Sequence, residues 1–497
     1  MQQKHSDAVK GGKYGRLLKN TLILTLGTFG SKLLVFLLLP LYTNCLLPSE
    51  YSSADLIANL ANFLIPVFCC GVSEGVLRFS LKEKSKNGEA GNDRKAVFSA
   101  SLCITLLGSL IAFLFFPLIQ KIRGFESYGL LVVLYVISSN LHSIAAEYVR
   151  ACERHALYSF QGVLNTVFVI TLNLIFLPWL DLGVYGYVLS IILADALTTV
   201  FLVFRARLYR DFSVRTIRKS LLKDLLRFSL PLIPGTILWW IISVSDRYLL
   251  TWMSGGTVNG LYVVAAKVPT LLTLLCTVFL SAWKVSAVTE DSGDSAAEKQ
   301  RKSEFYARVY QIYITVLFCA GAGIILFSKI FAKILFANEF YSAWQYIPVL
   351  TMGALLYNLS RFLGSVYFVN KRSGRSSLTA ALAAVLNVAL NLHLIPRYGA
   401  FGAAIATLVA YLAEYIVREV DTKREIRFTS YRIRILAYLL ILSLEAIVVT
   451  LEIPYWIWIS VGLTLATVLI SGKTLLVLLR SFMQGVKAVH KKFTNER

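Results

Sequence analysis

Charged side chains lie inside stretches of this sequence that are otherwise apolar and long enough to cross a lipid bilayer. Lys32 stands near the middle of an otherwise uncharged run from Asn20 to Asn44. An ammonium at membrane depth is costly unless it faces a protein interior or a water-filled cavity, so it marks a functional site. Similar charges recur in later apolar runs, as Glu74, Arg78, Asp195, Asp246, Arg247, Lys267, Arg361, Glu414 and Glu445. This pattern predicts a membrane protein with a polar interior.

The basic residues of these runs predict an anionic ligand. Lys32, Arg78, Arg247 and Lys267 fall in the first, second, seventh and eighth runs. In a duplicated chain these runs hold matching places, so the four side chains would face one another across a central cleft. Several cations in a low-dielectric cleft favour an anion, and lysine and arginine both suit phosphate oxygens. We predict that these four residues and Arg361 bind a phosphate or pyrophosphate group.

Structural interpretations of the same basic residues remain open. Glu74 and Arg78 are four residues apart, so they lie on one helical face and would form a simple ion pair. Lys267 and Arg361 would instead extend their long side chains to a membrane interface. Tryptophans in the runs, such as Trp239 and Trp240, are more typical of interface anchors or packing than of sugar binding.

The buried acids have two possible roles. A coupling proton or sodium ion would bind a carboxylate, and the candidates are Asp55, Glu74, Asp195 and Asp246. Alternatively, these acids only pair with cations of the cavity, as Asp246 would with Arg247, although adjacent residues on a helix do not share a face. Glu414 and Glu445 lie in later runs and fit helix packing or a lipid-facing groove.

No nucleotide-binding or metal-binding motif is present in the sequence. It contains no Walker, His-Glu-x-x-His or Cys-x-x-Cys pattern, which are the signatures of common nucleotide-binding proteins and metal sites. We therefore predict no enzyme activity, no metal and no cofactor, and transport that is either facilitated or coupled to H⁺ or Na⁺. The seven cysteines lack metal-ligand spacing and are interpreted as small apolar residues.

The elements that must position these residues are transmembrane helices. The chain has 497 residues, of which 57% are hydrophobic, and apolar runs of roughly 20 residues recur along it, as a bilayer span requires. We predict an all-α integral membrane protein with 14 spans, thirteen and fifteen being less favoured: 20–44, 55–80, 96–119, 128–150, 156–178, 183–204, 228–253, 258–285, 304–328, 342–369, 376–396, 400–420, 433–452 and 455–479.

The net charge of +22 is explained by topology. With the N-terminus in the cytoplasm, the tails and the connections on that side hold 38 of the 50 lysines and arginines, whereas the opposite loops hold five. This asymmetry follows the positive-inside rule and predicts that both termini are cytoplasmic. Basic loops attracted to anionic lipid head groups need no nucleic-acid partner. The first apolar run is too long for a signal-peptide core and is expected to stay in the mature protein.

Spacing between matching residues predicts two related halves. Residues recur 218 positions apart, as in Asn140 and Asn358, Arg154 and Arg372, Asn173 and Asn391, and Pro178 and Pro396. Gly183-x-x-Gly186 then matches Gly399-x-x-Gly402, 216 positions later. Six spans per half make a parallel repeat, which places a transport site between the lobes. The predicted domains are a cytoplasmic tail (1–19), a six-helix lobe (20–204), a basic connection (205–227), a second six-helix lobe (228–421), two added helices (432–480) and a cytoplasmic tail (481–497).

Four segments resemble a known family. GTFGSKLLVFLLLPLYTNCLLPSEYSSADL (Gly27–Leu56) and GVSEGVLRF (Gly71–Phe79) are similar to the first helices of bacterial polysaccharide transporters of the O-antigen and exopolysaccharide flippase type. SDRYLL (Ser245–Leu250) and GLYVVAAKV (Gly260–Val268) are similar to the seventh and eighth helices of that family. The resemblance covers nearly the whole chain.

The resemblance implies a fold and a function. The fold is two six-helix lobes plus two helices, within the superfamily that also contains multidrug and toxin extruders and peptidoglycan-precursor flippases. Family members move undecaprenyl-pyrophosphate-linked repeat units to the outer leaflet by alternating access. Their cavities are typically cationic, which agrees with Lys32, Arg78, Arg247 and Lys267. Lys32 stands where some relatives carry an arginine.

We therefore expect an exporter of lipid-linked oligosaccharide in the inner (cytoplasmic) membrane of a bacterium. Its expected partners are the lipid-linked substrate, membrane lipids and, for polysaccharide assembly, a glycan polymerase and glycosyltransferases. Flipping of a peptidoglycan lipid precursor and extrusion of drugs or cations are the alternatives. A membrane glycan polymerase or ligase is less favoured, because no large outer loop is present to hold its catalytic groups.

Overall fold

The fold is a set of helices. The computed structural model describes residues 30, 33–34, 36–82, 90–122, 124–289, 296–370, 372–426 and 428–495. Within these ranges the chain forms α-helices and short 3-10 helices and contains no strand. Nine of the described helices are long and apolar enough to cross a membrane, and the bent pair α3 and α4 is a tenth candidate. The all-α membrane fold is confirmed, whereas the count of 14 spans is not.

The difference in count has specific causes. The first predicted span, 20–44, lies mostly outside the described residues. Helices α10 (Ile233–Ser254) and α14 (Ile347–Val369) are not among the nine apolar candidates. Helix α15 (Ser373–Thr422) counts once, although non-helical backbone at Gly399 divides it into two segments that correspond to two predicted spans.

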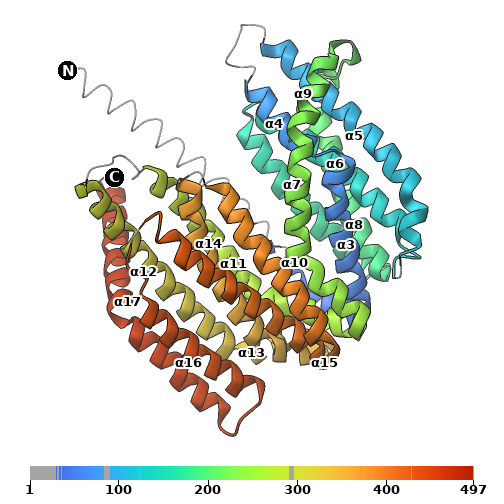
Figure 1. The fold of residues 1–497 in the computed structure, drawn as a ribbon. Helices are drawn as coiled ribbons and strands as arrows, with labels where there is room; N and C mark the ends of the chain where they lie inside the picture. The colour runs from blue at the N-terminus through green and yellow to red at the C-terminus, as the bar shows by residue number, and fades with distance from the viewer. Residues whose placement is uncertain are drawn as a thin grey trace, which may run out of the picture. The chain divides into compact units, whose positions relative to one another are not determined.

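Contacts divide the chain into two compact units, one ending at Val263 and the other continuing from Val264. Within the N-terminal unit, α6 packs against five other helices, α3, α4, α5, α7 and α8 (Figure 1). Helix α10 packs on α3 in this unit. The predicted domain boundary at 205–227 stays a prediction. The helices of the unit are α2 (Leu39–Cys45), α3 (Pro48–Phe68), α4 (Val72–Lys82), α5 (Ala90–Gln120), α6 (Gly129–Ala151), α7 (His155–Phe176), α8 (Gly183–Arg205), η2 (Leu208–Arg210), η3 (Val214–Thr216), α9 (Lys219–Ser229), η4 (Leu230–Leu232), α10 and the start of α11 (Gly256–Thr289).

The break between α3 and α4 lies within one predicted span. Pro66 sits in the last turn of α3, where its ring cannot donate a helical hydrogen bond. Cys70 and Gly71 then adopt positive φ angles of 52° and 63°. The two helices meet at a bend of 53°.

The C-terminal unit is built around aromatic side chains. Tyr306, Tyr310 and Phe362 are fully buried, and the Trp283 ring stacks on Phe362 with centroids 5.3 Å apart. Helix α17 packs against both α12 and α16, and α14 packs along α15 (Figure 1). The unit contains the rest of α11, α12 (Ala296–Leu326), α13 (Ser328–Leu335), η5 (Asn338–Tyr346), α14, α15, α16 (Arg432–Thr450) and α17 (Trp456–Asn495).

Local geometry agrees with the predicted duplication. Arg154, before α7, has φ −83° and ψ 58°, and Arg372, before α15, has φ −100° and ψ 48°. Gly183 and Gly399 have φ angles of 51° and 53°, in the left-handed region that glycine adopts without steric cost. These matching sequence positions therefore have similar backbone angles in both halves.

Candidate functional site

An ion pair joins α3 to α10 in the N-terminal unit. Arg247 Nη1 donates to both carboxylate oxygens of Asp55, at 2.9 and 2.7 Å. The side chains are 21% and 10% exposed. Asn59, one turn after Asp55, also donates to that carboxylate at 2.8 Å. The predicted ligand-binding arginine is thus held by a predicted coupling acid.

Asp246 forms no recorded ion pair with the Arg247 guanidinium. Its Oδ2 accepts a 2.6 Å hydrogen bond from the Tyr262 hydroxyl, and its Oδ1 accepts one from the backbone N–H of Arg247 at 2.9 Å. Asp246 is 9% exposed. Since adjacent helical residues point in different directions, Asp246 faces α11 while Arg247 faces α3.

A cavity of about 760 Å³ opens beside this pair. Arg247 lines it together with polar and aromatic side chains, which include Asn59, Asn62, Thr236 and Trp240. The Trp240 indole N–H donates to the Asn59 carbonyl oxygen at 2.7 Å, so α3 and α10 hold the ring in place. Trp240 is therefore a packed cavity-wall residue.

The cavity wall combines groups that suit a phosphorylated sugar. Of the three guanidinium nitrogens of Arg247, Nη1 donates to Asp55. The other two, Nε and Nη2, make no hydrogen bond to a described residue and are available as donors. A guanidinium with free N–H groups binds phosphate oxygens. Amide side chains and an aromatic ring provide the hydrogen bonds and apolar surface that fix a ligand in a pocket.

Asp195 is the centre of a second polar cluster. It lies on α8, is 7% exposed, and accepts hydrogen bonds from Ser139 of α6 and from Asn165 of α7, the latter at 2.9 Å. His142 Nδ1 lies 3.2 Å from Asp195 Oδ1, and His142 Nε2 lies 2.7 Å from Gln161 Oε1. Three helices thus converge on one carboxylate.

This Asp195 cluster can hold a proton. Its recorded ion pair is with His142, and histidine changes its charge near neutral pH. The Ser139 hydroxyl and the Asn165 amide N–H donate to the carboxylate, and Asn165 also donates to the Thr198 hydroxyl at 3.4 Å, so hydrogen-bond donors surround the acid. Among the described residues, no group of three or more His, Cys, Asp or Glu side chains is arranged to bind a metal.

Three other residues of the N-terminal half, Lys32, Glu74 and Arg78, were predicted to belong to the site. Lys32 lies outside the described residues. Glu74 and Arg78 are both exposed on α4, and the structure records no ion pair between them. The Arg78 guanidinium instead lies over the Phe228 ring, 4.2 Å from its centroid. The simple ion-pair interpretation is therefore not observed.

Two predicted basic residues belong to the C-terminal unit. Arg361 on α14 donates from Nη1 to the Thr277 hydroxyl at 3.0 Å, and its guanidinium lies 5.5 Å from the centre of the Tyr357 ring. Lys267 is partly buried on α11. Their roles in ligand binding, like those of the other site residues, stay predictions.

One buried ion pair was missed by sequence reasoning. Arg418 and Glu414, one helical turn apart on α15, form a 2.7 Å pair with exposed fractions of 7% and 6%. Arg418 also donates to Thr379 Oγ1 at 2.9 Å and to the Ser360 carbonyl at 3.0 Å. The four-residue spacing of the two residues in the sequence is the signal that could have indicated this pair. Glu445 on α16 is fully buried and accepts from Thr464 at 2.8 Å, which fits its predicted packing role.

Comparisons with known proteins give a family and relatives. The family described as "polysaccharide biosynthesis protein" matches residues 17–283. An uncharacterized membrane protein of Methanocaldococcus jannaschii is 20% identical over 376 residues, covering 72% of this chain and 86% of the relative. A probable low-salt glycan biosynthesis flippase, Agl15 of Haloferax volcanii, is 22% identical over 191 residues, covering 36% of this chain and 39% of the relative.

Solved structures show the same fold at low sequence identity. The lipid II flippase MurJ in an inward closed conformation gives a TM-score of 0.67 at 14% identity, covering 93% of this chain and 99% of that one. An inward-facing multidrug transporter of the MATE family and MOP superfamily gives 0.62 at 15% identity, covering 81% and 95%. The chain shares its fold with these two solved proteins.

Proposed function

Because the chain belongs to the polysaccharide biosynthesis protein family, we propose that it is a flippase for a lipid-linked oligosaccharide. Its cargo is an oligosaccharide repeat unit on undecaprenyl pyrophosphate. The sugar and pyrophosphate cross the membrane through the protein, while the prenyl chain stays in lipid. Fold alone does not assign a cargo, so the proposal depends on the chemistry of the cavity.

The observation that carries the proposal is the position of Arg247. Its guanidinium lines a cavity of about 760 Å³, with one nitrogen on Asp55 and two nitrogens free of hydrogen bonds to described residues. Asp55 stabilises the cation in a low-dielectric setting, and the free N–H groups bind the pyrophosphate. Asn59, Asn62 and Trp240 then contact the first sugar.

Coupling is assigned to the Asp195 cluster. Protonation of the Asp195–His142 pair, or binding of Na⁺ to the Asp195 carboxylate in place of its hydrogen-bond donors, would change the charge where α6, α7 and α8 meet. A ligand shifts a conformational equilibrium only if it binds the two states with different affinity. An ion that binds this cluster more tightly in one conformation of the protein shifts the equilibrium toward that conformation, and this shift drives alternating access.

The proposed location is the cytoplasmic membrane of a bacterium, with both termini in the cytoplasm. This orientation follows from the basic residues concentrated on one side of the predicted spans. A glycan polymerase would consume the flipped repeat unit, and glycosyltransferases would supply it.

The test is deletion of the gene followed by analysis of lipid-linked intermediates. We expect complete repeat units to accumulate in the inner leaflet and surface glycan to disappear, with both restored by the wild-type gene. Normal surface glycan in the deletion strain would refute the proposal. A build-up of lipid II in place of repeat units would assign the protein to peptidoglycan-precursor flipping.

Cation extrusion is a second candidate because of one observation. Two carboxylates contact Arg247, Asp55 through its guanidinium and Asp246 through its backbone N–H, so acids outnumber the one guanidinium at this contact. Uptake of ethidium into inverted vesicles distinguishes the two functions. Ethidium transport that Asp55→Asn abolishes, together with unchanged glycan, would favour the extruder.

A further inference from the structure

A basic pocket of about 550 Å³ lies at one end of the N-terminal unit, where α6 joins α7 and where α8 ends. Arg154, His155, Arg205 and Arg207 line it, against a single carboxylate, that of Glu153. Arg154 Nη1 donates to the Ala206 carbonyl at 3.1 Å, which ties the two turns together. The pocket therefore has a surplus of positive charge.

Two arginines of this pocket are available to a ligand. Arg205 and Arg207 are exposed, and the described part of the chain offers neither of them an ion-pair partner. Arg207 adopts left-handed backbone angles, φ 56° and ψ 41°, directly after α8. This position usually holds glycine, and here it carries a long cationic side chain.

Apolar surface adjoins the same pocket. Phe160 on α7, one turn after Ala156, is 54% exposed, and Phe204 on α8, next to Arg205, is 70% exposed. Both helices are candidate membrane spans. Guanidinium groups that adjoin exposed apolar helix surface suit an amphipathic anion, because a free anion would use only the charged groups.

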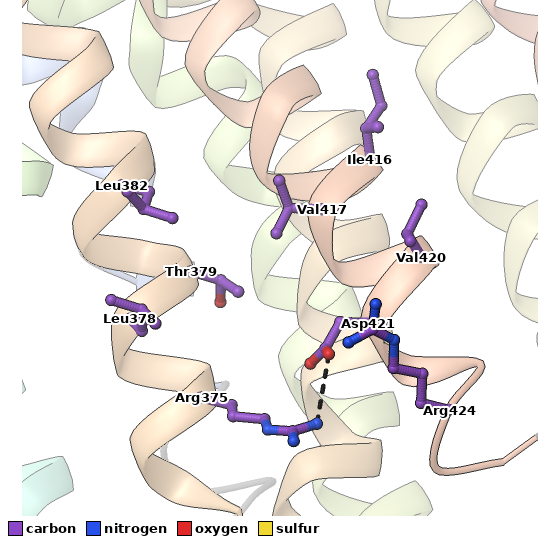
Figure 2. A pocket seen from close by; sticks show the side chains of 9 residues that line it. All are labelled: Arg375, Leu378, Thr379, Leu382, Ile416, Val417, Val420, Asp421 and Arg424. Atoms are coloured by element: carbon purple, nitrogen blue, oxygen red, sulfur yellow. Dashed lines mark hydrogen bonds and ion pairs between the residues drawn. The ribbon is translucent and has the colours of Figure 1, made fainter.

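The C-terminal unit contains a groove at the equivalent place. It measures about 530 Å³ and lies between the two segments of α15. Figure 2 shows Leu378 and Leu382 on one segment, Val417 and Val420 on the other, and charged residues gathered at one end. The long apolar part fits acyl chains.

The charged end of this groove has one paired and one available arginine. Arg375 pairs with Asp421 at 3.3 Å (Figure 2) and with Glu425 at 3.1 Å. Arg424 is exposed and has no ion pair among the described residues. The phosphate of a lipid head group would therefore lie on Arg424.

The two sites correspond through the internal repeat. Arg154 precedes α7 as Arg372 precedes α15, 218 positions later, with similar backbone angles. The end of α8 at Arg205 matches the end of α15 at Asp421, 216 positions later. Each unit has thus kept a charged pocket at the same place, between its fifth and sixth predicted spans.

We propose that each unit binds one anionic phospholipid in this pocket, with the phosphate on its available arginines and the acyl chains along the neighbouring apolar helix surfaces. Basic pockets between transmembrane helices bind anionic head groups in this manner. The lipid is part of the protein's environment and is distinct from its cargo. The inference does not depend on the proposed function.

The test is native mass spectrometry of the purified full-length protein, titrated with phosphatidylglycerol or phosphatidylcholine. One variant combines Arg205→Gln with Arg207→Gln, and a second carries Arg424→Gln. The matched control combines Arg215→Gln with Lys219→Gln, which removes two exposed charges from the connection outside both pockets. Thermal unfolding of each variant checks that its fold is intact.

We expect the wild type to hold two phosphatidylglycerol molecules more tightly than phosphatidylcholine. Each pocket variant weakens one of them by about five-fold per arginine, which corresponds to about 1 kcal/mol, and the control does not. Equal binding of the two lipids, or unchanged affinity in folded pocket variants, overturns the proposal. So does displacement of the lipid by inorganic phosphate, which indicates a free-anion site, or by farnesyl pyrophosphate, which indicates a cargo path.

Discussion

The pair of Arg247 and Asp55 allows stability and transport to be separated. Two charge-assisted hydrogen bonds of 2.9 and 2.7 Å join side chains that are 21% and 10% exposed. Removing one partner of a buried pair leaves an uncompensated charge, at a cost of about 3 kcal/mol. We therefore expect Asp55→Asn and Arg247→Gln each to destabilise the protein by about that amount.

The double variant Asp55→Asn/Arg247→Gln leaves no unpaired charge at this contact. Its loss of stability should be smaller than the sum of the two single losses, and the difference is a coupling energy of about 1–3 kcal/mol. If Arg247 binds the pyrophosphate, the same double variant remains inactive in spite of its recovered stability. Thermal unfolding in detergent measures the first effect, and complementation of surface glycan in a deletion strain measures the second.

Two results would refute this reasoning. Strictly additive destabilisation would mean that the pair is not coupled in the membrane protein. Wild-type glycan export by the double variant would mean that Arg247 does not bind the cargo. Arg215→Gln, at an exposed residue of η3, serves as the control for loss of one positive charge.

Three further predictions follow from other contacts. Asp195→Asn should lower ion-driven transport in proteoliposomes by at least about ten-fold and flatten its pH dependence, because His142, whose residue type changes charge near neutral pH, loses its carboxylate partner; an unchanged pH profile would exclude Asp195 from coupling. Glu414→Gln should destabilise the C-terminal unit by about 3 kcal/mol by leaving Arg418 unpaired, whereas Glu414→Leu with Arg418→Met should cost less, as measured by thermal unfolding. Gly399→Ala should destabilise the protein by about 1 kcal/mol, since its φ of 53° strains any residue with a Cβ; equal stability would show that the turn can rearrange.

The sequence predicted the elements and their chemistry. Apolar runs predicted membrane helices, and the repeat of Gly183 at Gly399 was part of the spacing that predicted two related halves. Both glycines have positive φ angles, which glycine adopts without steric cost. Charges such as Arg247 and Asp195 were recognisable because an ionised group at membrane depth is too costly to occur without a role. These are local properties, set by each residue and its near neighbours.

Only the tertiary structure decided which groups meet. Asp55 is 192 residues from Arg247 along the chain, and the alternative partner Asp246 is adjacent but points elsewhere. His142, Asn165 and Asp195 come from three helices. Helical periodicity assigns a side chain to a face, but helix packing decides which other helix that face contacts, and this choice depends on the summed fit of many side chains.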